Sequence, residues 1–452
     1  MSYKFSLFNI IDEMEDGTYS FYNTKSRHHL ILNLKQDIQG KNINLENCDF
    51  IQFLPEKTKI ALIKKGFIID ASVDEIEDLK KQSNEDRFGD GFGLILALLP
   101  TLNCNFRCPY CFEDFSNIHA NQKMTQETQN NIVDFAKNKL AAGIKGPLYV
   151  KWFGGEPLLA KETMLELSKK LQEVAAVTGN KYISSMVTNG YLLNELSSSD
   201  LEKLDLFAVQ VTIDGPEKIH NQRRPHKEGK NSFNQIIKNL EGISKFIKRI
   251  YIRINVDKSN AKDIPELLSY LENHGLLEKC QYNLGYIDTQ TGRYSIDPLC
   301  HSVITKEDVL YIDSVVMQGL SKLGIEEIEH SEYPKFITFA CDAQLKNSYV
   351  INPDGYIFKC LNDATILERS LFNINTKQNI NPDREHLFLY CNPYAVSECK
   401  KCSFLPVCQG GCPAKYIDIK EHRPFCWPFT YVLKEKILKQ AKNNLKKEAL
   451  NG

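Results

Sequence analysis

The chain lacks an excess of charge of either sign. Its 452 residues include 56 Lys and Arg against 57 Asp and Glu, which gives a net charge of −1. Nucleic-acid-binding proteins are typically marked by clustered positive charge, so the composition gives no support for that class. The sequence also lacks a long apolar run. The run from Leu94 to Leu99 is far shorter than the ~20 residues that a membrane span needs.

No charged segment followed by an apolar one opens the sequence, which begins Met1-Ser2-Tyr3-Lys4-Phe5. We therefore expect a cytoplasmic protein with no membrane or nucleic-acid partner. What the chain does contain is 14 cysteines. In a reducing compartment such a set is not a disulfide framework, so metal or redox chemistry is the leading explanation.

Ten of the cysteines fall into two groups. The first group, Cys104, Cys108 and Cys111, has the spacing C-x3-C-x2-C. Three thiolates on a four-iron cubane leave one iron without a protein ligand, and such an open position can bind a substrate or cofactor, as in catalytic zinc sites. A three-cysteine zinc site completed by a distant histidine is the alternative. The spacing alone leaves both open, because both metals favour thiolates.

Strands and helices alternate through residues 92–290. The predicted strands lie at residues 94–99, 148–153, 183–188, 206–214 and 250–256. Helical spacing of apolar residues predicts helices between them, and Ser232-x-x-Gln235 predicts a capping box at the start of one. This repetition predicts a parallel sheet, either open or closed into a barrel.

Two of the predicted strands are polar on one face. Gln210, Thr212 and Asp214 share a face of one strand, and Tyr251, Arg253 and Asn255 share a face of the next. A strand covered on both sides by helices is apolar on both faces, so these side chains are expected to line a polar cavity; solvent exposure at a sheet edge is the alternative. We expect a partial barrel with its site at the carboxyl ends of the strands.

The same stretch resembles the radical S-adenosylmethionine (SAM) enzymes. The landmarks are C-x3-C-x-aromatic-C with Tyr110 as the aromatic residue, Gly154-Gly155-Glu156-Pro157, Thr188-Asn189-Gly190, and Thr212-Ile213-Asp214-Gly215-Pro216 followed by His220 and Arg224. The resemblance implies a partial (β/α)6 barrel. It implies that Cys104, Cys108 and Cys111 hold a catalytic [4Fe–4S] cluster and that Gly154-Gly155-Glu156-Pro157 binds the amino group of SAM.

The resemblance also implies that Thr212 and Arg224 contact the ribose and carboxylate of SAM. The residues expected to bind SAM are Tyr110, Gly154, Gly155, Glu156, Thr188, Asn189, Thr212, Asp214, Arg224, Arg253 and Asn255.

The second cysteine group runs from Cys341 to Cys426 among frequent turn residues. Its order is Cys341-x13-Gly355-x4-Cys360, then Cys399-x2-Cys402-x5-Cys408-x3-Cys412, then Cys426. By itself it fits a pair of zinc knuckles or iron–sulfur clusters. Beside the upstream motifs it resembles the SPASM domain, which carries two auxiliary [4Fe–4S] clusters.

That resemblance implies one cluster on Cys399, Cys402, Cys408 and Cys426, and another on Cys341, Cys360 and Cys412. The fourth position of the latter is either open, and then able to bind a substrate thiolate, or filled by Cys391, Cys280 or Cys300. Each of these three cysteines, and Cys48, can equally be a small buried hydrophobe.

The first ninety residues are predicted to form a hairpin around Asp16-Gly17, helices, a strand at residues 67–70 and a helix at residues 73–82. A glycine-containing linker is predicted at residues 86–93. The order resembles a winged-helix-like element that binds a leader peptide as an added strand; a structural cap on the barrel is the alternative. The expected domains are 1–85 (leader recognition), 92–300 (radical SAM barrel), 330–430 (SPASM) and 431–452 (a C-terminal helix with a solvated face).

The whole chain thus resembles a radical SAM/SPASM peptide maturase of α/β class with three [4Fe–4S] clusters and SAM. The resemblance implies that it abstracts a hydrogen from a ribosomally made precursor peptide and joins a cysteine sulfur to the resulting carbon as a thioether. A flavodoxin- or ferredoxin-type reductant is the expected electron donor. The alternatives are a carbon–carbon cross-link, an epimerised residue or a formylglycine as the product. Outside the enzyme class, the alternative is a zinc-organised peptide-binding scaffold.

Overall fold

The computed structural model describes residues 2–14, 17–33, 51, 53–113, 123–287, 305–323, 334–418, 426–437 and 439. The chain divides into two compact units. Unit 1 combines residues 1–87, 331–341 and 391–452, and unit 2 combines residues 88–330 and 342–390. Cys48 and Cys300 lie outside the described residues, as does Asp16 of the predicted hairpin turn.

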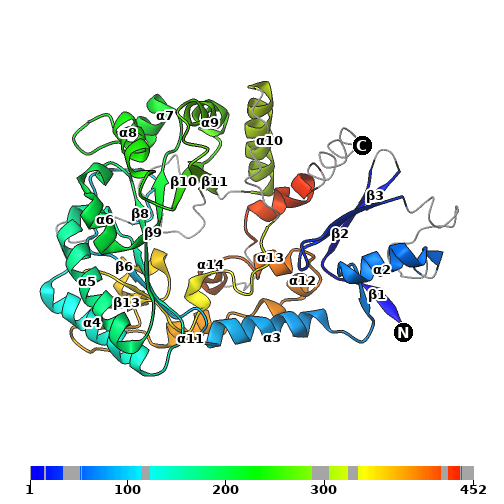
Figure 1. The fold of residues 1–452 in the computed structure, drawn as a ribbon, viewed down its shortest axis with the longest axis horizontal. Coiled ribbons are helices and arrows are strands. Elements are labelled where there is room, and N and C mark those ends of the chain that lie inside the picture. Colours follow the sequence, from blue (N-terminus) through cyan, green and yellow to red (C-terminus); the bar gives the residue numbers. More distant parts are fainter. Residues whose placement is uncertain are drawn as a thin grey trace. The chain divides into compact units, whose positions relative to one another are not determined.

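Unit 2 is built on a nine-stranded sheet with the order β11-β10-β9-β8-β7-β6-β12-β13-β14. Six consecutive parallel strands form the barrel part (Figure 1). They are β6 (Leu94–Leu98), β7 (Leu148–Trp152), β8 (Tyr182–Thr188), β9 (Leu206–Thr212), β10 (Arg249–Val256) and β11 (Cys280–Tyr286). The predicted parallel sheet is confirmed for the five expected strands, with ends shifted by one or two residues, whereas β11 was not predicted.

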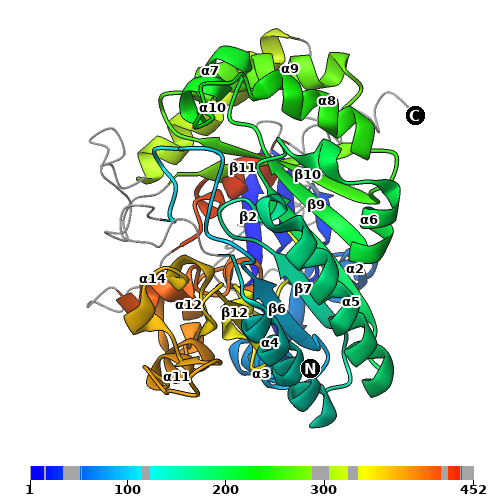
Figure 2. The ribbon, with the colours of Figure 1, turned by 90° about the vertical axis from the view of Figure 1, so that its left-hand side faces the viewer.

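Helices cover one face of this sheet (Figure 2). They are α4 (Gln126–Ala141), α5 (Lys161–Thr178), α6 (Ser198–Leu204), α7 (Glu217–Arg223), α8 (Phe233–Ile243), α9 (Ile264–Asn273) and α10 (Lys306–Lys322). The apolar face of each strand packs against these helices in one continuous core, which includes Trp152, Val209 and Ile252 with essentially no exposure. Burial of this apolar surface is the main stabilising contribution to unit 2.

The opposite face of β9 and β10 carries the predicted polar side chains: Gln210, Tyr251, Arg253 and Asn255 are half-buried and Thr212 is buried. Burial alternates along β7, β8 and β10, so that Arg253 and Asn255 are half-buried while Ile252 and Ile254 are buried. The period-two geometry of a strand places these polar side chains on one surface. The sequence pattern therefore identified the face that the helices leave uncovered.

Three further strands extend the sheet beyond β6. Strand β12 (Ser348–Ile351) pairs parallel with β6, and β13 (Tyr356–Phe358) and β14 (Phe372–Asn373) follow in antiparallel order. Asn352-Pro353-Asp354-Gly355 forms the predicted turn, since the backbone N–H of Gly355 donates to the carbonyl of Asn352 at 3.0 Å. Residues 342–390, which also contain α11 (Asp383–Leu389), thus belong with the barrel. The predicted domain limits 330–430 stay a prediction.

The helix expected to start at Ser232 is present, but its predicted capping box is wrong. Ser232 makes no capping bond; its hydroxyl donates to Oδ1 of Asn221 at 3.0 Å, and Gln235 bonds Asn239. A tertiary partner has replaced the local one. Reciprocal capping boxes occur instead at Ser197 with Asp200, and at Thr305 with Asp308.

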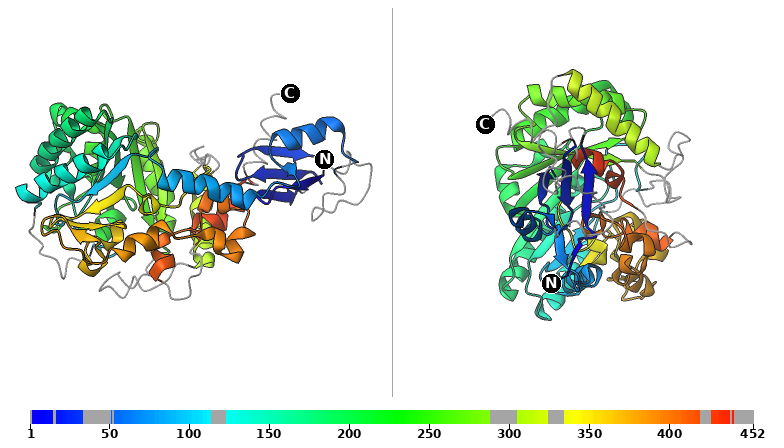
Figure 3. Two further views of the ribbon diagram at one scale, coloured as in Figure 1. Left: turned by 90° about the horizontal axis from the view of Figure 1, so that it is seen from below. Right: turned by 90° about the vertical axis from the view of Figure 1, so that its right-hand side faces the viewer.

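Unit 1 begins with a three-stranded antiparallel sheet in the order β2-β3-β4 and a two-stranded pair β1-β5 (Figure 3, blue). The elements are β1 (Tyr3–Phe5), β2 (Asn9–Glu13), β3 (Tyr19–Asn23), β4 (His29–Leu32), α2 (Glu56–Lys64), β5 (Ile68–Asp70) and α3 (Glu75–Phe88). The predicted hairpin is formed by β2 and β3. The predicted linker is partly wrong, because α3 continues to Phe88.

The carboxy-terminal part of unit 1 consists of short helices, α12 (Ser397–Lys400), α13 (Leu405–Cys408) and α14 (Pro413–Asp418), followed by helical residues 429–437. They share two apolar clusters with the amino-terminal elements: Phe8 and Leu79 pack with Tyr394 and Leu405, and Tyr22 packs with Leu433. Most of the predicted helix 431–452 lies outside the described residues. Of the helices that the structure describes, none combines the length and apolarity required to cross a membrane.

Candidate active site

The sequence-predicted site of unit 2 lies where the parallel strands end. The cysteine loop follows β6, Gly154-Gly155-Glu156 follows β7, Asn189-Gly190 follows β8, and Asp214 follows β9. Ligands collect at the carboxyl ends of strands in parallel sheets because the connecting loops converge there. The topology therefore brings these motifs to one edge of the sheet.

The glycine pair lies directly against the cysteine loop. The backbone N–H of Gly155 donates to the carbonyl of Thr101 at 3.3 Å, and the N–H of Glu156 donates to that of Asn103 at 2.8 Å. A Cβ on Gly154 would overlap the carbonyl oxygen of Thr101, and one on Gly155 would overlap that of Asn103. Only glycine permits this approach, so the two residues fix the position of the loop that carries Cys104.

Glu156 is fully buried and accepts three hydrogen bonds. Its Oε1 accepts from the Thr188 hydroxyl at 2.8 Å and from the backbone N–H of Leu158 at 3.1 Å. Its Oε2 accepts from the backbone N–H of Asn189 at 2.8 Å. Burial raises the pKa of Glu156 to about 7, although these donors act in the opposite direction. The carboxylate thus joins the end of β7 to the end of β8.

The three thiols of the first group lie in one buried region. Burial raises the pKa of Cys104 to about 12, and the neighbouring Glu156 and Cys108 raise it as well. Burial likewise raises the pKa of Cys108 and of Cys111. Asn189 Nδ2 lies 3.9 Å from Cys104 Sγ and donates to Asn105 Oδ1 at 2.7 Å. The structure therefore brings the cysteine loop together with Glu156, Thr188 and Asn189.

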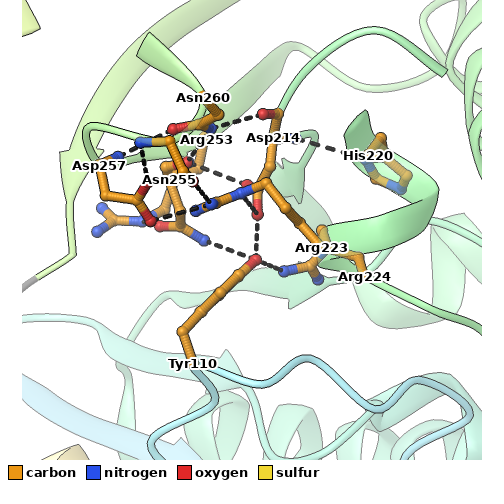
Figure 4. Close-up of polar contacts among 10 residues, drawn as sticks. Tyr110, Asp214, His220, Arg223, Arg224, Arg253, Asn255, Asp257 and Asn260 are labelled. Atoms are coloured by element: carbon orange, nitrogen blue, oxygen red, sulfur yellow. Dashed lines mark hydrogen bonds and ion pairs between the residues drawn. The ribbon is translucent and has the colours of Figure 1, made fainter. Parts of the chain in front are cut away.

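A second group of predicted residues converges on the Tyr110 hydroxyl (Figure 4). This hydroxyl donates to Asp214 Oδ2 and accepts from Arg224 Nη1 at 2.7 Å. Asn255 lies beside it, with its backbone N–H donating to Asp214 Oδ1 at 3.0 Å and its side chain holding the Arg253 guanidinium at 2.9 Å. Burial acts against the charge of Arg224, but Cys108, Tyr110 and Asp214 raise its pKa well above the ordinary value. Arg224 is therefore a cation beside the cysteine loop.

Three residues that the sequence did not single out complete this network. Arg223 pairs with Asp257 at 2.9 Å, and Asn260 Nδ2 donates to the carbonyl of Asp214 at 2.7 Å (Figure 4). His220 accepts from the backbone N–H of Asp214 at 3.4 Å. Asp257 directly follows β10, and this position at a strand end is the signal that could have found it. Thr212 is buried at the end of β9.

Several buried donors in this region have no protein partner. Among the described residues, Asn105 Nδ2 and Arg224 Nε are buried and make no hydrogen bond. Buried polar groups are normally satisfied, so these two donors fit a bound group bearing acceptors. The three thiols supply the donor chemistry that iron–sulfur clusters use. The residues present thus fit a thiolate-bound cluster with a polar ligand beside it.

The carboxy-terminal thiols of unit 1 form their own neighbourhood. Burial raises the pKa of Cys399 to about 12, and Cys408, Cys426 and Cys402 raise it further, so these four thiols are close together. Cys341 and Cys412 lie in the same unit, whereas Cys360 lies in unit 2. Within the described ranges, no three His, Cys, Asp or Glu side chains converge to hold a single metal ion. In a cubane each thiolate binds a different iron.

The family profile described as the Radical SAM superfamily matches residues 98–271. The strand topology and the motif positions agree with that match. The chain therefore contains a radical SAM domain. Enzymes of this superfamily use a [4Fe–4S] cluster and SAM.

Among similar proteins, a cysteine-type anaerobic sulfatase-maturating enzyme from Clostridium perfringens (strain 13 / Type A) is 23% identical over 320 residues, covering 68% of this chain and 85% of the relative. The structure titled native anSMEcpe with bound AdoMet and Cp18Cys peptide aligns at TM-score 0.56 and 20% identity, covering 79% of this chain and 99% of that one. Streptococcus suis SuiB bound to precursor peptide SuiA aligns at TM-score 0.50 and 16% identity, covering 94% and 99%. These likenesses establish a shared α/β fold with a central parallel sheet.

Proposed function

We propose that this chain is a peptide maturase that removes a hydrogen atom from a ribosomally made precursor peptide and joins a cysteine sulfur to the same carbon as a thioether. The observation that carries the proposal is the polar, half-buried face of β9 and β10. This face ends at the cysteine loop and the Tyr110–Asp214–Arg224 network. It is a surface on which a peptide side chain can meet the cluster loop.

The proposed roles of the residues follow from their contacts. Cys104, Cys108 and Cys111 would hold the catalytic cluster, and Gly154, Gly155 and Glu156 would fix its loop and the amino group of SAM. Arg224, a buried cation with an unpaired Nε, would bind the SAM carboxylate. Thr212, Asp214, Arg253 and Asn255 would line the ribose side. When bound, the cluster and SAM supply the radical that abstracts the hydrogen, while the protein positions the groups and excludes water.

Cys399, Cys402, Cys408 and Cys426 of unit 1 would bind one auxiliary cluster of a SPASM domain. The resemblance assigns the other to Cys341, Cys360 and Cys412. The electrostatic proximity of the first four thiols supports the first assignment. An auxiliary cluster would accept the electron released when sulfur joins carbon, and a flavodoxin- or ferredoxin-type protein would reduce the catalytic cluster.

The amino-terminal sheet of unit 1 would bind the leader of the precursor as an added strand. Within the described residues, β4 stands at one end of the strand order β2-β3-β4. The edge of a sheet is the surface to which an extended peptide adds as a strand. The structure of SuiB bound to its precursor peptide aligns with 94% of this chain, whereas the structure of anSMEcpe aligns with 79%. The broader cover supports a precursor peptide as the partner.

A second product is favoured by a specific finding. The relative from Clostridium perfringens is a cysteine-type sulfatase-maturating enzyme, and that similarity supports oxidation of a peptide cysteine to formylglycine. The two products differ in composition. A peptide with a thioether keeps the cysteine sulfur and has lost two hydrogen atoms, whereas a peptide with formylglycine has lost the sulfur atom. Mass spectrometry of the product separates them.

The experiment uses the anaerobically reconstituted full chain, SAM, dithionite and the candidate precursor peptide encoded beside its gene. We expect about twelve irons per chain if all three clusters are cubanes, cleavage of SAM to 5′-deoxyadenosine, and a peptide lighter by two hydrogens. The C104A/C108A/C111A variant serves as the control and should cleave no SAM. About two zinc ions and no iron would overturn the proposal, and a sulfur-free product would favour formylglycine.

A further inference from the structure

Three segments of unit 1 that each carry a cysteine meet at the side chain of Gln409. Gln409 is 3% exposed, its Nε2 donates to the carbonyl of Ile337 at 2.9 Å, and its Oε1 accepts from the Tyr394 hydroxyl at 2.5 Å. Ile337 shortly precedes Cys341, Tyr394 shortly follows Cys391, and Gln409 itself shortly precedes Cys412. One buried amide thus holds these three segments together.

The segments of Cys391 and Cys412 are in direct contact. Gly410 has φ +81°, and a Cβ at this position would lie 2.6 Å from Cβ of Pro393. Each of these two residues is two positions from a cysteine, Gly410 from Cys412 and Pro393 from Cys391. Both the left-handed backbone and the close approach require glycine, so the sequence Gly410-Gly411 brings the two cysteine segments together.

The Cys341 segment is tied to the same place. The backbone N–H of Ile337 donates to the carbonyl of Pro406 at 2.9 Å, which lies in α13 just before Cys408. Phe336 packs in the apolar cluster that contains Tyr394 and Leu405. Two hydrogen bonds therefore anchor the Cys341 segment to the segment before Cys412, and the packing of Phe336 in the cluster of Tyr394 links it to the Cys391 segment.

Cys391 and Cys412 also lie near a common cation. The Arg87 guanidinium and the Cys412 thiol are both close enough to the Cys391 thiol to act on it electrostatically. Arg87 is buried at the end of α3, so the two thiols and this side chain share one interior region of unit 1.

Cys280 does not compete with Cys391 for such a role. It is 2% exposed at the first residue of β11, opposite Ile250, within the apolar core of unit 2. Its surroundings are those of a small buried hydrophobe.

From this arrangement we infer that Cys391 is a thiolate ligand of the auxiliary cluster to which Cys341 and Cys412 are assigned above. The inference rests on the proposed function, which supplies the auxiliary clusters. The Cys391 thiol gives up its proton to solvent as its sulfur binds iron, and nothing is oxidised or reduced.

The test uses the full chain carrying C104A/C108A/C111A, which leaves only the auxiliary clusters. This parent should hold about eight irons in two cubanes. Adding C391A should lower the iron count to about seven if one iron is lost, with the EPR signal of a three-iron cluster after mild oxidation. If the whole cluster is lost, the count should fall to about four. Adding C280A, the matched control, should leave the iron count and the EPR spectrum unchanged.

A second measurement needs no substitution and is independent of folding of the variants. In the reconstituted wild-type chain, iodoacetamide should fail to alkylate Cys391 and Cys412, as read by peptide mass spectrometry. After iron is chelated, both should react. Alkylation of Cys391 at the same rate in both states would overturn the inference, as would a C391A variant that keeps about eight irons and the parental spectrum.

The failures of the two proposals are distinguishable. If the parent itself holds no iron, the auxiliary clusters are absent and the inference falls with them. If the parent holds about eight irons and C391A changes nothing, only the ligand assignment is wrong.

Discussion

Buried polar side chains at the strand ends carry much of the organisation of the site. Glu156 joins two strand ends through three hydrogen bonds, and Tyr110 joins the cysteine loop to Asp214 and Arg224. Hydrogen bonds to a charged group are stronger than neutral ones, and removing one partner leaves the other unsatisfied in a dry environment. Single substitutions here should therefore have effects larger than at the surface.

Glu156→Gln should destabilise unit 2. The new amide keeps one oxygen acceptor but turns an N–H group towards a backbone N–H donor, and an unsatisfied buried donor costs about 1–3 kcal/mol. Anaerobic urea unfolding measures this loss. Glu166→Gln is the matched control, because Glu166 lies half-exposed on α5 beside Lys170, and it should leave the midpoint nearly unchanged. Equal effects of the two substitutions would contradict the role given to Glu156.

His220 should make stability depend on pH. It is fully buried, and burial with the nearby Arg224 holds its pKa well below the ordinary value of 6.5. Below about pH 6.5 this histidine is therefore protonated in the unfolded chain but stays neutral in the folded chain. The free energy of unfolding then falls by up to about 1.4 kcal/mol per pH unit. Stability from this group is present above pH 6.5 and is lost as the pH falls.

The measurement is the free energy of unfolding at pH 7.5 and 5.5 for the wild type and for His220→Asn. Other groups titrate in this range, so the difference between the two proteins isolates His220: the wild type should lose more stability than the variant on acidification. His274→Asn, at a more exposed position, is the control and should track the wild type. Parallel pH profiles for wild type and H220N would refute the expectation.

At the scale of elements, close packing of helices depends on single glycines. Gly319 of α10 faces Pro265 of α9, where an added Cβ would overlap the proline ring. Gly242 of α8 has nothing within 4 Å of the same added atom. Both glycines lie within helices, but only Gly319 is packed against a neighbouring side chain. Alanine substitutions at the two positions can therefore be compared directly.

Gly319→Ala should destabilise unit 2 by about 1–3 kcal/mol, because a rigid ring cannot move aside without disturbing the core. Gly242→Ala should stabilise it by roughly 0.5–1 kcal/mol, because alanine favours the helix. Thermal unfolding of both variants measures the difference in sign. A G319A variant at least as stable as the wild type would show that α9 and α10 pack less tightly than described.

The elements also show what local sequence can and cannot predict. The strands at 94–98, 148–152 and 249–256 were expected within two residues, because each alternates or is wholly apolar over its length. Ser232 was expected to cap its own helix and instead bonds Asn221. Strand β12 was not predicted, because its place beside β6 is decided by tertiary pairing across about 250 residues.

Across the whole molecule, the chain order and the spatial order differ. The motifs of the site were predicted because each directly follows a strand, and parallel strands share one edge. Arg223, Asp257 and Asn260 were missed because no spacing rule links them to the cysteine motif. The division of residues 331–452 between two units was also missed, because composition does not change where the chain passes from one unit to the other.

Unit 1 is assembled from segments that lie far apart in the sequence. Phe8 and Leu79 are buried against Tyr394 and Leu405, which the ribosome makes about 300 residues later than residue 87. At ~5–20 residues per second this delay is roughly 15–60 s. During that interval most of unit 2 is made, while Phe8 and Leu79 still lack these partners. Unit 1 therefore closes after most of unit 2 has been synthesised, and a metal centre within it is completed only then.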